Sequence, residues 1–229
     1  MKLLLTSTGI KNKSIEKKFF EMVGKGPQEL AVAYIPTAMH VARPADKHWI
    51  INNLVSLHEM KIRTIDIVDI SAISEEIWRP RLEKADAIMV GGGNPYHLIY
   101  WMRKTGLSNI LPNLLKDKVY IGCSAGSVVL GKFIISTAPK KYLPEIPEFE
   151  GDEGLGIVDF CIRPHFYNPD RPQFTEQTVQ ELANQYKSTF YALDDNSVIA
   201  MDGDNLEVIS EGKWGKFEQK NKDKEFNVK

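Results

Sequence analysis

Residues 118–131, with the sequence KVYIGCSAGSVVLG, limit the possible folds of this chain more than any other stretch. Residues 119–121 are β-branched or aromatic and predict a short buried strand, and the apolar end of the stretch can begin a helix. Between them, residues 122–126 have the G-x-S-x-G spacing of a nucleophile elbow, a sharp strand-to-helix turn that requires small neighbours. This turn would lift the hydroxyl of Ser124 clear of a sheet and leave the backbone N–H of Ala125 free to donate to an oxyanion.

Short apolar runs and amphipathic segments alternate along the N-terminal half of the chain. They predict strands at residues 2–8, 30–35, 62–68 and 87–90, and helices at residues 14–23, 44–60, 74–84, 95–104 and 107–115. Strands that alternate with helices at this spacing indicate a mostly parallel sheet with helices on both faces. We therefore expect an α/β fold with three layers, α/β/α, around a mostly parallel central sheet.

Two of these helices carry more detailed predictions. In the second helix, Ile51, Leu54, Val55 and Leu57 are candidate core contacts. The third helix has Ser74 as a candidate N-cap, because a serine hydroxyl can accept a hydrogen bond from a backbone N–H of the first turn.

The C-terminal half is less regular. Residues 132–150 contain three prolines and predict a long surface segment near the elbow. Beyond it we expect a helix at residues 175–186, a hairpin turn at residues 202–204, and strands at residues 158–162, 190–193, 197–201 and 206–210. The last stretch is almost wholly polar. The sequence thus predicts one α/β domain over residues 1–217 and a polar tail over residues 218–229.

The composition excludes several classes of function. The chain has 229 residues, and its 29 Lys and Arg nearly balance its 30 Asp and Glu, so we expect no nucleic-acid partner and no membrane partner. No segment has the roughly 20 apolar residues that a membrane-spanning helix needs. Two cysteines without a C-x-x-C pair predict neither a disulfide framework nor a metal site. We expect a cytoplasmic protein without a cofactor, as a monomer or homodimer.

A serine nucleophile requires a base, usually a histidine. Of the five histidines, His165 is the best candidate, because it follows the predicted strand 158–162 within a turn-rich segment. The other four are expected at the surface or at helix boundaries. A carboxylate must in turn orient the histidine, and Asp194 and Asp195 follow the predicted strand 190–193. Either acid could serve, although the two could also simply form a turn.

A glycine run, Gly91-Gly92-Gly93, follows the strand predicted at residues 87–90. Its backbone N–H groups are not shielded by side chains, which suits an oxyanion hole and would equally suit a phosphate. The run is not a Walker loop, because no Gly-Lys-Ser or Gly-Lys-Thr follows it.

Four segments in order, residues 91–98, 122–126, 164–166 and 193–197, together resemble the peptidase E (aspartyl dipeptidase) and cyanophycinase family of serine peptidases. The resemblance covers roughly residues 1–210, and the ordered set is more specific than any one motif. It implies a fold similar to that of class I glutamine amidotransferase domains, in which a cysteine occupies the elbow.

The resemblance also implies roles for residues of this chain. It makes Ser124 the nucleophile and His165 the base, and it assigns the oxyanion hole to Gly92, Gly93 and Ala125. The third member is usually a glutamate, with which Asp195 aligns best.

Substrate binding is less well defined by the resemblance. Aspartyl dipeptidases hold the substrate's aspartyl carboxylate with an arginine, at whose position this chain has Thr175, so strict Asp-X specificity is not expected. Arg171 lies nearby in the sequence, and we include it with Asn94 and Tyr167 as candidate substrate-binding residues. Arg163 and the segment over residues 132–150 could also shape the substrate pocket, and the sequence does not rank them.

The leading hypothesis is therefore a serine peptidase that hydrolyses short, dipeptide-like substrates. An esterase or other acyl hydrolase could use the same three residues, although the order Ser, His, Asp differs from that of ordinary α/β-hydrolases. A third hypothesis makes Cys123 the nucleophile, as in amidotransferases. The alternative without catalysis is a flavodoxin-like binding module whose glycine run holds a phosphate.

Overall fold

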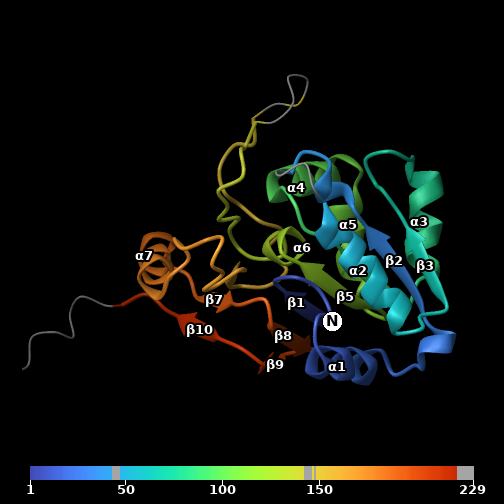
Figure 1. Ribbon diagram of the computed structural model, residues 1–229. Coiled ribbons are helices and arrows are strands. Elements are labelled where there is room, and N and C mark those ends of the chain that lie inside the picture. Colours follow the sequence, from blue (N-terminus) through green and yellow to red (C-terminus); the bar gives the residue numbers. More distant parts are fainter. Residues whose placement is uncertain (43–46, 142–145, 147, 221–229) are drawn as a thin grey trace, which may run out of the picture.

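A seven-stranded sheet forms the centre of the protein (Figure 1). The computed structural model describes residues 1–42, 47–141, 146 and 148–220. The strands lie in the order β3-β2-β4-β5-β1-β8-β9, with the bounds β1 (Lys2–Thr6), β2 (Ala31–Ile35), β3 (Thr64–Ile67), β4 (Ala87–Val90), β5 (Val119–Cys123), β8 (Ser197–Asp202) and β9 (Asn205–Ser210). The first five strands of this order pair in parallel, and β8 is antiparallel to both β1 and β9. The predicted mostly parallel sheet is confirmed.

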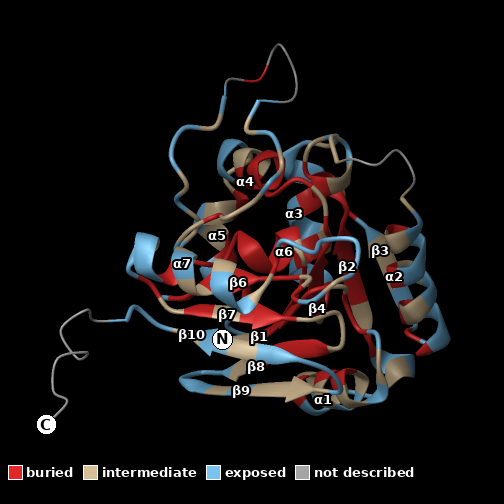
Figure 2. Cartoon of the chain, turned by 60° about the vertical axis from the view of Figure 1, so that its left-hand side comes forward, coloured by how far each residue is buried: buried red, intermediate tan, exposed pale blue. Residues whose placement is uncertain are grey.

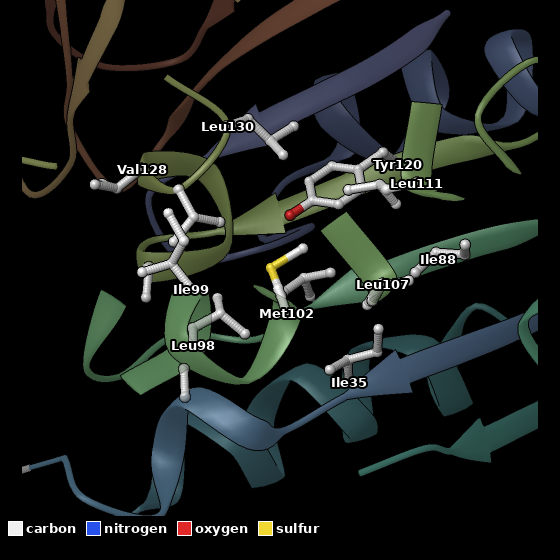
Figure 3. Close-up of a cluster of buried hydrophobic side chains, with 14 of the residues drawn as sticks. Ile35, Ile88, Leu98, Ile99, Met102, Leu107, Leu111, Tyr120, Val128 and Leu130 are labelled. Carbon is white, nitrogen blue, oxygen red and sulfur yellow. The ribbon is translucent and has the colours of Figure 1, made fainter. Parts of the chain in front are cut away.

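Helices cover both faces of this sheet. The helices α1 (Lys13–Val23) and α2 (His48–Glu59) share one buried hydrophobic cluster with the sheet. On the opposite face, α3 (Glu75–Lys84), α4 (Pro95–Lys104) and α5 (Leu107–Leu114) share another, part of which Figure 3 shows. The expected three layers are therefore present, and burial concentrates in the sheet between the helices (Figure 2).

The strand sequences explain why the sheet is buried on both sides. Successive side chains of a strand point to opposite faces. In β1, Leu3 and Leu5 pack into the cluster of α3, α4 and α5, while Leu4 packs into the cluster of α1 and α2. A strand covered by helices on both faces needs apolar residues at consecutive positions, which is the pattern of the sequence.

A second, three-stranded sheet lies beside the central one, in the order β10-β7-β6. It consists of β6 (Cys161–Arg163), β7 (Phe190–Leu193) and β10 (Trp214–Phe217), and α7 (Glu176–Tyr186) packs on it. The prediction for residues 158–162 was wrong at its start, because β6 begins only at Cys161. Sequence analysis also missed β10, a short strand that contains Gly215 and Lys216 and pairs antiparallel with β7.

In α2, the buried face differs from the one that the sequence pattern predicted. Ile51 and Val55, expected in the core, are 61% and 44% exposed. The buried face of α2 is instead formed by Ile50, Asn53 and Leu57. Because Asn53 is polar, the sequence pattern did not identify it as part of the buried face, and the prediction chose a different face of the helix. The predicted start of this helix at residue 44 lies outside the described residues.

Two other local predictions also changed. Ser74 stands at the N-cap position of α3, but its side chain makes no capping hydrogen bond there. Short 3₁₀ turns at Pro27–Glu29 and Thr37–Met39, not anticipated from the sequence, precede and follow β2.

The long segment after the elbow is described only in part. Of the surface segment predicted over residues 132–150, positions 142–145 and 147 lie outside the described residues. An isolated antiparallel bridge joins Phe133 to Glu153. Of the predicted polar tail, only residues 218–220 are described. No helix within the described ranges is long and apolar enough to span a bilayer.

Candidate active site

Ser124 lies on a tight turn between β5 and the short helix α6 (Ala125–Val128). Its backbone has φ 47° and ψ −104°, a conformation that costs energy for any residue other than glycine. The N–H of Ser124 donates to the carbonyl oxygen of Thr6 at 3.0 Å, and its own carbonyl accepts from Val128 at 2.9 Å. These bonds hold the strained serine at the end of the central sheet.

The two glycines of the elbow are required by close backbone approach. A Cβ on Gly126 would overlap the carbonyl oxygen of Val90 on the neighbouring strand β4. A Cβ on Gly122 would lie 2.7 Å from the backbone of Ser127. The G-x-S-x-G pattern thus follows from the packing of the turn against the sheet.

His165 comes from the segment after β6, and its ring lies against the serine. The Oγ of Ser124 is 3.0 Å from Nε2 of His165, and Nδ1 of the same ring is 2.9 Å from Oδ1 of Asp195. With the ring proton on Nδ1, which this carboxylate favours, Nε2 is free to accept the serine proton. The N–H of His165 also donates to the hydroxyl of Ser7, just after β1.

Asp195 has a second hydrogen-bond donor. The side-chain amide of Asn168 donates to Oδ2 at 2.9 Å, and the hydroxyl of Thr8 donates to the backbone carbonyl of Asp195 at 3.0 Å. Burial by itself would raise the pKa of Asp195, but the hydrogen bonds from His165 and Asn168 and the nearby charges of His165 and Lys11 outweigh it and lower the pKa below its ordinary value. The carboxylate is therefore held in its charged form.

Asp194, the other candidate acid, serves the turn instead. Its Oδ1 accepts from the N–H of Asn196 and the hydroxyl of Ser197, and its Oδ2 accepts from the N–H of Lys213. The residues alone left both acids open, and the family resemblance favoured Asp195. The structure places Asp195 beside the histidine and Asp194 among backbone groups.

The glycine run passes close to the serine. A Cβ on Gly92 would lie 3.4 Å from Cβ of Ser124, and Gly93 has φ 140° with its Cα packed against the backbone of Ala38. Asn94 is buried and caps α4 by accepting from the N–H groups of Tyr96 and His97, while its amide donates to Pro139. These bonds hold the asparagine side chain within the protein, and its predicted contact with substrate stays a prediction.

A pocket of about 750 Å³ opens over the serine. Its lining includes Gly92, Gly93, Asn94 and Trp49. The remaining lining comes mostly from the elbow and from the segments on either side of His165, and includes Ser7, Ala125, Ile135, Thr137, Arg163, Asn168, Arg171, Phe174 and Asp195. Of the candidate substrate-binding residues, Arg171 is at the pocket, whereas Tyr167 is absent from its lining. The Tyr167 hydroxyl donates to Glu176 instead, and the Nζ of Lys213 lies 4.9 Å from its ring.

Sequence analysis did not single out Trp49 and Asn168, which also line the pocket. It named Arg163 only among several residues that could shape the pocket. Arg163 and Asn168 flank His165 at two residues before and three after, and this proximity in sequence was the available signal. Thr175, at the position of the family's arginine, caps α7: its hydroxyl accepts from the N–H of Thr178.

The other histidines and the cysteine do not form a competing centre. His40, His48 and His58 are exposed, as expected, but His97 is buried at 3% exposure, contrary to prediction. Burial raises the pKa of the Cys123 thiol to about 12, although a hydrogen bond with Thr6 acts in the opposite direction. The thiol is thus protonated at neutral pH and is a poor nucleophile. Within the described ranges, no group of three or more His, Cys, Asp or Glu could hold a metal ion.

Similar proteins are known among bacterial peptidases. The chain is 29% identical to the uncharacterised peptidase Lmo0363 of Listeria monocytogenes, over 80% of this chain and 86% of that protein. It is 31% identical to Peptidase E of Streptomyces coelicolor, over 54% and 52% of the two chains, and 38% identical to Peptidase E of Shewanella oneidensis, over 44% and 41%. The matched segments thus span about half or less of those two Peptidase E proteins.

Solved structures show the same fold. A crystal structure of a provisional Peptidase E protein from Listeria monocytogenes EGD-e superposes with a TM-score of 0.76 at 25% identity, covering 92% of this chain and 98% of that one. A peptidase from an acI-B1 Actinobacterium has a TM-score of 0.69 at 17% identity, covering 96% and 95%, and supports the fold alone. The model of peptidase family S51 matches residues 3–209, nearly all of the described fold. The chain therefore belongs to peptidase family S51 and is a serine-type peptidase.

Proposed function

We propose that this protein hydrolyses short peptides through Ser124 as nucleophile, His165 as general base and acid, and Asp195 as the acid that orients the histidine. The observation that carries the proposal is the continuous hydrogen-bonded chain from the serine hydroxyl through both ring nitrogens to the carboxylate. The strained serine backbone supports it, because such strain concentrates at functional sites.

The first half of the reaction forms an acyl-enzyme. Oγ of Ser124 attacks the carbonyl carbon of the scissile peptide bond while Nε2 of His165 takes the hydroxyl proton. Asp195 stabilises the imidazolium ion that forms. When the tetrahedral intermediate collapses, the C–N bond breaks and His165 gives its proton to the leaving amine. The ester formed on Ser124 retains the N-terminal part of the substrate.

The second half repeats these roles with water. His165 removes a proton from a water molecule, which attacks the ester carbonyl, and then returns the proton to Oγ of Ser124 as the acid product leaves. In both halves the negative oxygen would be bound by backbone N–H groups of Gly92, Gly93 and Ala125. The closeness of Gly92 to Ser124 and the absence of shielding side chains on the run support this assignment. One such donor contributes about 2.7–4 kcal/mol to lowering the barrier.

The size of the pocket favours short substrates. A volume of about 750 Å³ lies within the range of small-molecule sites, which is roughly 300–1,000 Å³. Asn94, which follows the glycine run, donates a hydrogen bond to the carbonyl oxygen of Pro139, which lies in the segment after the elbow. This bond holds the two segments together, so the pocket is bounded on that side. Such a site suits a peptide of few residues better than an extended chain.

Active-site labelling tests the proposal directly. A fluorophosphonate probe followed by peptide mapping should label Ser124 in the wild type, and labelling should be lost in Ser124→Ala and strongly slowed in His165→Ala. A screen of dipeptides with acidic, basic and neutral first residues then identifies substrates. Hydrolysis that persists unchanged in Ser124→Ala would refute the proposed nucleophile.

A further inference from the structure

Arg163 is a buried cation at the wall of the pocket. It is the last residue of β6 and is only 7% exposed. Its guanidinium carbon lies 3.6 Å from the ring centroid of Phe174, and its Nη1 donates to the carbonyl oxygen of Ile135 at 2.8 Å. This stack and this hydrogen bond fix the plane of the guanidinium within the lining of the pocket.

Within the part of the chain that the structure describes, no neighbouring acid balances the charge of Arg163. Among the described residues, no Asp or Glu oxygen lies within 4.0 Å of its guanidinium. The two carboxylates that share the pocket lining are Asp195, which is paired with His165, and Asp170, which is exposed. Burial, together with the nearby charge of Arg171, lowers the pKa of Arg163 to about 10. The side chain is therefore still positive at neutral pH.

A buried charge without a counter-ion is costly unless a ligand supplies one. The guanidinium has five N–H donors, and the hydrogen bonds described for Arg163 use one of them. The remaining donors match the planar geometry of a carboxylate, which an arginine can bind through two parallel hydrogen bonds. The chemistry of the position thus calls for an anion, and in a peptidase the anion available is a carboxylate of the peptide.

The position of Arg163 in the chain indicates which carboxylate. His165, two residues further on, must lie next to the leaving amine in order to protonate it. In a dipeptide the leaving residue carries its free C-terminal carboxylate on the carbon bonded to that amine. The guanidinium of Arg163 and the ring of His165 line the same pocket, so we take the carboxylate of the leaving residue as the counter-ion of Arg163.

We propose that Arg163 binds the free C-terminal carboxylate of the leaving residue and so restricts the enzyme to substrates whose scissile bond is next to the C-terminus. This inference rests on the function proposed above and defines its substrate class. It assigns the recognition to a residue of β6, whereas Thr175, at the position of the family's substrate arginine, caps a helix.

The test compares matched substrates within each variant. The dipeptide that the wild type hydrolyses fastest is measured as the free acid and as the C-terminal amide, and kcat/KM is determined for both. We expect the wild type to prefer the acid by about 10- to 100-fold, the range of a hydrogen-bonded charge pair. In Arg163→Gln this ratio should approach one, and in Arg163→Lys it should be intermediate. Arg79→Gln, an exposed arginine on α3, is the matched control and should keep the wild-type ratio.

The outcomes separate this inference from the proposed function. If the wild type shows no preference for the acid, the inference is overturned without any variant, and this result does not depend on whether Arg163→Gln folds. If a folded Arg163→Gln, checked by its melting temperature, keeps the preference, the inference is likewise overturned while labelling of Ser124 still supports the peptidase. A third outcome is that the wild type prefers dipeptide amides whose first residue is acidic and that Arg163→Gln removes this preference. The guanidinium would then bind the side chain of the first residue, and the C-terminal assignment would be wrong. Absence of Ser124 labelling would refute the proposed function itself.

Discussion

Replacement of Asn168 should disturb the acid–base pair without touching the serine. Its amide makes the 2.9 Å hydrogen bond to Oδ2 of Asp195, whose side chain is only 20% exposed. A hydrogen bond to a charged group contributes about 1.5–3 kcal/mol, which corresponds to a rate loss of about 10- to 100-fold if the bond is needed to orient the carboxylate. The hydroxyl of Thr8 still holds the backbone of Asp195, so the loss in Asn168→Ala should appear in kcat rather than in folding.

The pH dependence gives this prediction a second readout. The hydrogen bond from Asn168 is one of the causes that lower the pKa of Asp195. Its removal moves that pKa upward, and the acidic limb of kcat/KM that reports the ionisation of Asp195 moves to higher pH. Asn168→Asp has nearly the same shape but puts a second carboxylate against Oδ2. Because two carboxylates at that distance cannot both ionise readily, its acidic limb should move further than that of Asn168→Ala.

The stability that the Asn168–Asp195 hydrogen bond contributes should also depend on pH. Because the folded-state pKa of Asp195 is below the value of about 3.9 in an unfolded chain, its charged form stabilises the fold above that pH, and this contribution is lost as the pH falls through the lowered folded-state pKa. The difference in melting temperature between the wild type and Asn168→Ala should therefore be larger at pH 7 than at a pH low enough to protonate Asp195. This difference is measured by circular dichroism.

The control and the refuting result are simple. Asn113→Ala, on the exposed face of α5, should match the wild type in pH profile and in kcat. A folded Asn168→Ala with wild-type kcat and an unmoved acidic limb would show that the second carboxylate oxygen of Asp195 does not need this donor.

Three further predictions concern the elbow and the two acids. Ser124→Ala should abolish peptide hydrolysis in a product assay, whereas Cys123→Ala should be far less damaging, and equal losses would contradict the assignment of the nucleophile. Asp195→Asn should lower kcat by up to about 10⁴-fold, the effect known for the corresponding change in a serine protease. Asp194→Asn should instead lower the melting temperature, because it weakens hydrogen bonds of the turn; a larger loss of kcat in Asp194→Asn than in Asp195→Asn would reverse the two roles. Gly126→Ala should reduce the free energy of unfolding by at least about 1–3 kcal/mol, since its Cβ would overlap a backbone carbonyl of β4, and a denaturant titration that shows wild-type stability would contradict this packing.

The alternation of apolar runs and helices was sufficient to predict the layers of the fold. Strand β4, helix α4 and strand β7 have the predicted bounds. Periodicity was less reliable where one polar residue interrupts a buried face, as Asn53 does in α2. It also could not assign β6 and β7 to a separate sheet, because pairing between strands depends on contacts between segments far apart in the chain.

The sequence by itself determined the elbow. Only small residues fit where the chain turns from β5 into α6 beside β4, and the spacing of Gly122, Ser124 and Gly126 reflects this requirement. It also identified His165 as the candidate partner of Ser124, but it did not give the distance between the two side chains. The family resemblance favoured Asp195 over Asp194, but only the tertiary structure shows why: the two side chains leave the same turn in different directions, and just one meets the imidazole. The tertiary structure alone also revealed the donor on the far side of that acid and the buried charge of Arg163. These depend on which groups from distant segments come within a few ångströms of each other, and no local pattern specifies that.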